Sequence, residues 1–114
     1  MKPREVHHLH AHAPTDEEIK AWIGAPVTDV FGKSVGKVVD VYDSGDRIEW
    51  LLIKHRRSHH FLAPVKDAVG DHNKLFLPYA ADHIEAAPEV DPGHAASEQT
   101  LAAAAEHYGL DRKR

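Results

Sequence analysis

The central part of the chain, residues 25–79, consists of short apolar runs separated by glycine, asparagine and aspartate, a pattern typical of β-strands joined by tight turns. Strands are predicted over residues 26–30, 35–42, 47–54, 61–65 and 74–79. The apolar positions of the second strand do not alternate cleanly, so a bulge is expected near Gly36. Residues Trp50 to Ile53 are all apolar, which predicts a strand buried on both faces. Strands at this spacing predict a mainly β fold, a small antiparallel barrel.

A short helical segment is predicted before the first strand. Thr15 and Glu18 have the spacing of a capping box, in which the hydroxyl and the carboxylate each accept a backbone N–H of the other residue. Ile19, Trp22 and Ile23 follow at the spacing of one helix face. These residues give the short helical segment one apolar face, and Gly24 and Pro26 end it.

Helical segments are also predicted after the last strand. Residues 80–86 allow at most two turns, with Ile84 facing the strands. Ser97 is expected to cap a final helix that runs to about Tyr108 and packs back on the strands through Leu101 and Tyr108. Gly109 and Leu110 then suit a Schellman ending.

The inward positions of the predicted strands define an expected core. Its members are Val27, Val38, Val41, Ile48, Trp50, Leu52, Phe61, Leu75 and Leu77. Trp22, Trp50 and Tyr108 are expected to pack in or beside this core, since aromatic residues at such positions more often fill cores than stack on ligands. Pro26 and Pro64 lack the N–H that a ladder needs, so the first and fourth strands are the expected sheet edges.

Composition and charge narrow the classes of protein. A chain of 114 residues with a net charge of −4 has room for one domain and has no domain-wide basic field for nucleic acid. It contains no cysteine, which excludes disulfides, thiolate catalysis and cysteine-ligated metals. Its apolar runs are far shorter than the roughly 20 residues of a membrane-spanning helix. We therefore expect a cytoplasmic protein without a membrane span.

The chain divides into four expected parts. Residues 1–14 form a disordered histidine-rich tail, residues 15–90 the barrel, residues 91–110 a helical extension, and residues 111–114 a charged tail. No cofactor is implied by any motif in these parts.

Two clusters contain candidate binding residues. His8, His10 and His12 point the same way in an extended segment, and neutral imidazoles at that spacing bind Zn²⁺, Ni²⁺ or Cu²⁺. Metal binding of this kind is also common without a physiological role, and both interpretations stay open.

The second cluster is the loop between the third and fourth strands, where cationic and imidazole side chains could contact an anion, an acidic partner or RNA. Its candidate contact residues are Lys54, Arg56, Arg57, His59 and His60. The alternative interpretation is a solvated loop with no ligand.

Catalysis is not expected. The carboxylates Glu17, Glu18, Glu85 and Glu89 fall on helix ends or loops without a paired acid and base. The serines stand in turn or capping contexts, and no phosphate-binding glycine loop is present in the sequence.

The stretch IGAPVTDVFGKSVGKVVDVY, residues 23–42, resembles the opening hairpin of the PRC-barrel domain. The matching positions are Gly24, Val27, Gly32, Val35, Gly36, Lys37, Val38, Asp40 and Val41. The resemblance continues through Ile48 to Ile53, Phe61 to Pro64 and Leu75 to Tyr79, and the closing residues 107–110 are similar to a bacterial stand-alone or stress-associated branch. It implies a PRC-type barrel of five to six short antiparallel strands, with a short N-terminal helical turn and one or two C-terminal helices.

The resemblance also implies a function. PRC-barrels occur in the cytoplasmic part of the photosynthetic reaction-centre H subunit and in the C-terminal half of RimM-type ribosome maturation factors, and neither setting uses the barrel as an enzyme. The first hypothesis is therefore a non-catalytic adaptor that binds an unidentified protein or a second copy of itself. The alternatives are an RNA- or ribosome-associated factor that uses residues 54–60, and a histidine-dependent metal-binding or pH-responsive module.

Overall fold

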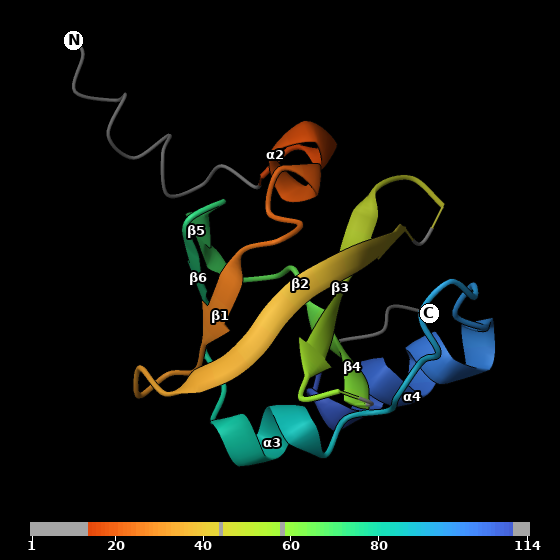
Figure 1. The fold of residues 1–114 in the computed structure, drawn as a ribbon. Helices are drawn as coiled ribbons and strands as arrows, with labels where there is room; N and C mark the ends of the chain where they lie inside the picture. The colour runs from red at the N-terminus through yellow and green to blue at the C-terminus, as the bar shows by residue number, and fades with distance from the viewer. Residues whose placement is uncertain (1–13, 44, 58, 111–114) are drawn as a thin grey trace, which may run out of the picture.

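A computed structural model describes residues 14–43, 45–57 and 59–110 of the chain (Figure 1). Three short helices and six strands alternate with turns along these residues. Their bounds are α2 Asp16–Lys20, β1 Pro26–Thr28, β2 Ser34–Asp43, β3 Ile48–His55, β4 His59–Pro64, β5 Val69–Asp71, β6 Lys74–Phe76, α3 Ala81–Glu85 and α4 Glu98–His107. The mainly β class and the order of the predicted helices and strands are confirmed.

All six strands belong to one twisted sheet with the order β4-β3-β2-β1-β6-β5. The observed sheet differs from the expected closed antiparallel barrel in two respects. Within the described residues no ladder joins the outer strands β4 and β5, so the sheet is not closed. In addition, β1 and β6 run parallel, with Val27 opposite Leu75 and Thr28 opposite Phe76. The parallel pair forms because β6 returns from the β5–β6 hairpin in the same direction as β1, which hydrophobic periodicity does not reveal.

The core contains residues of β1–β4, of β6 and of the three helical segments, and Figure 1 shows the helices around the strongly curved β1–β4 part of the sheet. Eight of the nine expected core side chains are buried, and Val41 is partly buried against them. The run from Trp50 to Ile53 is buried at every position, as predicted for a strand covered on both faces. Ile19 and Trp22 of the first helical segment join this core, whereas Ile23 is exposed.

The bulge expected near Gly36 is present in the ladder between β1 and β2. Val27 lies opposite Gly36 and Thr28 lies opposite Ser34, which leaves Val35 as the extra residue. A Cβ atom on Gly36 would overlap the carbonyl oxygen of Lys54 on the next strand, so only glycine lets β2 and β3 approach this closely.

The predicted helix caps are confirmed. The Thr15 N–H donates to Glu18 Oε1 at 2.9 Å, and the Glu18 N–H donates to Thr15 Oγ1 at 3.1 Å, which completes the capping box of α2. The Ser97 hydroxyl accepts the Thr100 N–H at 3.0 Å at the start of α4. At the other end of α4 the Leu110 N–H donates to the Ala105 carbonyl, as in a Schellman motif.

The prediction of sheet edges from proline is half correct. β4 is an edge strand and ends at Pro64, but β1 is an interior strand between β2 and β6. Pro26 is tolerated there because it is the first residue of β1, where a missing N–H costs little.

The free side of β4 is covered by the chain that follows α3. The Leu62 N–H donates to the Pro88 carbonyl at 3.2 Å, and the Val90 N–H donates to the His60 carbonyl at 3.1 Å. The Tyr108 hydroxyl adds a 2.7 Å hydrogen bond to the Leu62 carbonyl. Residues 88–90 and Tyr108 therefore close this edge against strand pairing. The boundary expected at residue 90 stays a prediction, and residues 1–13 and 111–114 lie outside the described part.

Candidate interaction surfaces

The basic loop predicted as a contact site forms the hairpin between β3 and β4. The ladder pairs Lys54 with His60 and His55 with His59, so these two pairs point to opposite faces of the sheet. Arg56, at a φ of 64°, and Arg57 are exposed at the turn. The predicted contact residues therefore lie on both faces of the β3–β4 hairpin and at its turn, and their role in binding stays a prediction.

Two glutamates lie beside the histidines of this hairpin. His55 Nδ1 donates to the Val35 carbonyl at 2.7 Å, and its Nε2 lies 3.5 Å from Glu85 Oε2. His59 Nδ1 lies 3.3 Å from Glu89 Oε2. These carboxylates come from α3 and from the segment that covers β4, and they offset the positive charge of the hairpin on that face.

The histidines predicted as metal ligands, His8, His10 and His12, lie outside the described residues, so that hypothesis stays a prediction. Within residues 14–43, 45–57 and 59–110, no group of three or more metal-ligating side chains is arranged to hold an ion.

Asp29 is a buried carboxylate that joins three parts of the chain. Its Oδ1 accepts the N–H of Phe31 at 2.9 Å and of Lys33 at 2.7 Å, which fixes the β1–β2 turn. Its Oδ2 accepts the N–H of Ala81 at 2.9 Å and so caps α3, whose own preceding residue Ala80 has no side-chain cap. Burial alone would raise the pKa of Asp29, but these backbone hydrogen bonds and the Lys33 charge outweigh it and hold the pKa below its usual 3.8.

Tyr108 anchors the end of α4 in an aromatic cluster. Its ring centroid lies 4.8 Å from that of Tyr79 and 6.4 Å from that of Trp50. On the outer side the rings of His83 and His107 stack at 4.2 Å, and His107 Nε2 donates to the His83 carbonyl at 2.7 Å. Burial, with a smaller contribution from Tyr79, raises the pKa of Tyr108 well above its usual range.

Asp29 and Tyr108 are the buried groups with a shifted pKa, and both are engaged in structural hydrogen bonds. The oxygens of Asp29 are occupied by backbone N–H groups, and the hydroxyl of Tyr108 is occupied by the Leu62 carbonyl. Perturbed pKa values often mark catalytic groups, but here the hydrogen bonds hold turns, a helix start and a sheet edge.

A group of exposed apolar side chains lies on the β5–β6 hairpin and in the turn that follows β1. We call Val30, Phe31, Val69 and Phe76 the outer apolar face. Their exposed fractions are 54%, 81%, 65% and 42%. Val69 and Phe76 are direct partners in the β5–β6 ladder, and Phe76 is also opposite Thr28 of β1.

The alternation along β6 and β1 directs Phe76 and Val30 away from the core, and Phe31 is exposed in the turn that follows β1. Leu75 and Leu77 point into the core, whereas Phe76 between them points outward. Val30 continues β1 beyond the buried Asp29, and its N–H donates to the Tyr79 carbonyl at 3.0 Å. Lys74 Nζ lies 5.4 Å from the Phe76 ring centroid, so a cation borders this face.

A groove of about 380 Å³ lies at the open edge of the sheet, between α2 and β5. We call it the edge groove. Its lining residues are Pro14, Glu18, Ala21, Trp22, Ala68, Val69, Gly70, Asp71 and His72. Figure 1 shows β5 and β6 at the end of the sheet nearest α2, away from α3 and α4.

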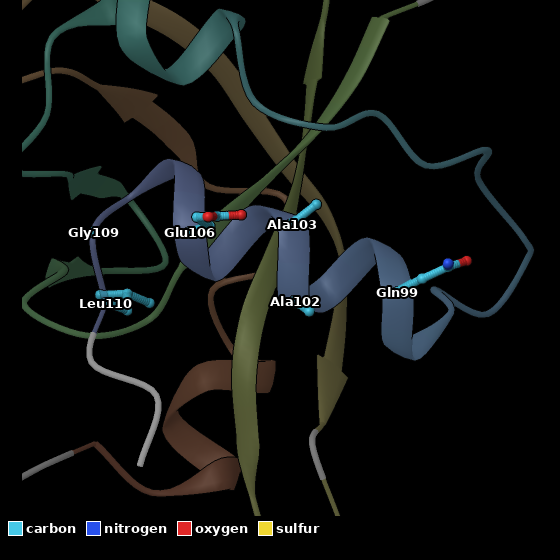
Figure 2. Close-up of a pocket in the computed structure, with 6 residues that line it drawn as sticks. All are labelled: Gln99, Ala102, Ala103, Glu106, Gly109 and Leu110. Atoms are coloured by element: carbon cyan, nitrogen blue, oxygen red, sulfur yellow. The ribbon is translucent and has the colours of Figure 1, made fainter. Parts of the chain in front are cut away.

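A second depression, of about 590 Å³, lies along α4 (Figure 2). Its walls are Gln99, Ala102, Ala103, Glu106, Gly109 and Leu110. Two of these residues are alanines, and the two polar side chains, Gln99 and Glu106, lie about two turns apart on one helix. It therefore lacks the converging polar groups of a ligand site.

The sequence did not predict β5, the edge groove or the outer apolar face. The exposed Phe31 in the Phe31-Gly32 turn was a usable signal, because large aromatic residues in tight turns have little core to bury into. The groove had no local signal, since residues about fifty positions apart form its two walls.

The chain belongs to the PRC-barrel domain family, because the model of that family matches residues 14–87. The matched range contains every strand, α2 and α3, and ends immediately before the segment that covers β4. No curated protein matched the chain in a sequence search. Among the described residues no helix is long and apolar enough to cross a bilayer.

Proposed function

We propose that this PRC-barrel domain is a non-catalytic adaptor that binds another protein through the outer apolar face. The observation that supports this most is the exposure of Phe76 and Val69, which are ladder partners in the β5–β6 hairpin, and of Phe31 in the turn that follows β1. Exposed apolar side chains that lie together on a folded domain mark interaction sites, since water contact with them is unfavourable. The structural use of Asp29 and Tyr108 is consistent with a role without catalysis.

The test is capture with the full chain as bait. We compare the wild-type chain with a Phe31→Ser, Phe76→Ser double variant, and use Ile23→Ser as a control because Ile23 is also exposed but lies outside the outer apolar face. The expected result is a specific protein that is retained by wild type and by the control and is lost by the double variant. Reconstitution with the purified partner must reproduce this order. Equal capture by all three chains would contradict the proposal.

A second copy of the chain is the other occupant that this test separates. Sedimentation velocity over a range of protein concentrations reports self-association directly, and the double variant should abolish it if copies pair through the outer apolar face. Association with RNA through the hairpin of Arg56 and Arg57 is a weaker proposal, because Glu85 and Glu89 lie beside two of its imidazoles.

A further inference from the structure

We propose that the edge groove binds an extended segment of a partner protein by strand addition to β5, and that this segment combines an apolar residue with a lysine or arginine. The inference rests on the proposed function, because it gives the form and the chemistry of the bound partner. The two surfaces share Val69, but Phe31 and Phe76 lie outside the groove lining, so variants of those phenylalanines and of the groove test the two proposals separately.

The first support is the state of the two sheet edges. The β4 edge is closed within the chain by Pro88, Val90 and Tyr108. β5 pairs with β6 on one side, and the groove lies along its other side. Asp71 and Lys74 flank a two-residue turn and therefore form the hydrogen-bonded pair that closes the hairpin. The alternation of an antiparallel ladder then directs the N–H and C=O of Gly70 away from β6 and into the groove.

Gly70 also lets β5 lie close to β6. A Cβ on this residue would overlap the Lys74 carbonyl oxygen, so the position is restricted to glycine by β6 itself. A strand edge facing a helix across a groove is a recurring arrangement for binding extended peptides, in which main-chain hydrogen bonds hold the peptide and pockets choose its side chains.

The second support is the chemistry of the walls. Trp22, Ala21 and Ala68 present apolar surface from the α2 side and from the approach to β5, which suits an apolar side chain of the peptide. Asp71 contributes a carboxylate to the same lining, whereas the Glu18 carboxylate there accepts the Thr15 N–H of the capping box. The Asp71 carboxylate accepts the neutral Asn73 N–H at 2.8 Å, so its negative charge is retained. A basic residue next to the apolar one is the complement of this lining.

The experiment selects short linear peptides from a random, unconstrained phage library on the immobilised full chain. The enriched peptide is then titrated into ¹⁵N-labelled full chain. The two tryptophans supply internal reporters, because Trp22 lines the groove and Trp50 lies in the core. We expect enrichment of an apolar residue next to lysine or arginine, a shift of the Trp22 indole signal, and little change at Trp50.

Matched variants test the location. Ala21→Tyr fills the groove and should weaken binding by about tenfold or more, whereas Lys20→Tyr, one residue earlier and outside the lining, should change it by less than about twofold. Asp71→Asn should weaken the binding of a basic peptide, whereas Asp67→Asn, outside the lining, should leave its binding unchanged. Each variant is first checked for wild-type signal dispersion.

The results that would overturn the inference are equally specific. Absence of any enriched peptide, enrichment of acidic peptides, or binding that Ala21→Tyr leaves unchanged each contradicts strand addition at the edge groove. Shifts confined to Phe31 and Phe76 would also overturn it while leaving the proposed function intact. Loss of capture by the double phenylalanine variant is measured separately, so the two proposals are distinguishable.

Discussion

Asp29 shows how one side chain sets the arrangement of several elements. It lies just after β1, and its carboxylate reaches a turn on one side and the start of α3, 52 residues later, on the other. Asp29 falls in a predicted strand, and its link to α3 is not predictable from the sequence because a hydrogen bond to a backbone N–H 52 residues away has no local pattern. The turn residues and helix caps were predictable because their partners lie three or four positions away.

Asp29→Asn should lower the melting temperature at neutral pH. The amide keeps one acceptor oxygen but turns an N–H donor toward the donors that the carboxylate satisfies, and it removes the charge. Because folding lowers the pKa of Asp29, its stabilisation is present above the usual 3.8 and is lost as the pH falls through the folded-state pKa. The difference in melting temperature between wild type and variant should therefore shrink in acid.

The measurement is a series of thermal melts from neutral pH to below pH 3.8, with Asp82→Asn as the control. Asp82 is adjacent to Ala81 in the first turn of α3 but is exposed. If the difference in melting temperature between wild type and Asp29→Asn stays constant across the pH series, the lowered pKa of Asp29 in the folded state is contradicted.

Tyr108→Phe should destabilise the fold by about 1–3 kcal/mol, the cost of leaving a buried carbonyl without its hydrogen-bond donor. The carbonyl concerned is that of Leu62, which accepts the Tyr108 hydroxyl at 2.7 Å. Tyr42→Phe is a matched control, since the Tyr42 hydroxyl bonds the His94 carbonyl at 3.1 Å in an exposed position. Urea denaturation measures both, and equal effects would show that the Leu62 carbonyl is hydrated without Tyr108.

At the scale of elements, the long apolar runs were the predictable part. β3 and β4 follow from residues 50–53 and 61–65, and the bulge in β2 follows from its broken alternation. β5 was not predicted because its three residues, Val69, Gly70 and Asp71, are all exposed and show no periodicity. The parallel pairing of β1 with β6 was missed because strand direction depends on the path of the intervening chain.

Removal of α4 should lower the melting temperature. A chain that ends at Ala96 loses Tyr108, which covers Trp50 and Tyr79, and the buried Ala104 and Ala105. It also frees the Leu62 carbonyl on the β4 edge. Differential scanning calorimetry measures the change, with a chain that ends at Leu110 as the control. An unchanged transition would show that α4 does not stabilise the sheet.

At the scale of the whole molecule, the two edge strands of the sheet differ. Other parts of the chain cover β4, whereas within the described residues β5 pairs with no strand other than β6. Residues 88–90 and Tyr108 cover β4, while β5 lies at the other edge with the edge groove beside it and with the exposed Val69 and Phe76 in its hairpin. The resemblance to PRC-barrels gave the family and the β-rich fold from sequence. The resemblance did not predict the difference between the two edges. The segment that covers β4 follows the matched range, and the groove forms between α2 and β5, which lie about fifty residues apart in the sequence.

Hydrogen exchange of the full chain, with and without its purified captured partner, tests the central claim most directly. The account predicts new protection in residues 28–33 and 69–76, which contain β1 with its turn and the β5–β6 hairpin. Backbone amides in the hairpin around Arg56 and Arg57 should exchange at the same rate in both samples. Protection confined to residues 54–60, with no change in β5 and β6, would contradict the account.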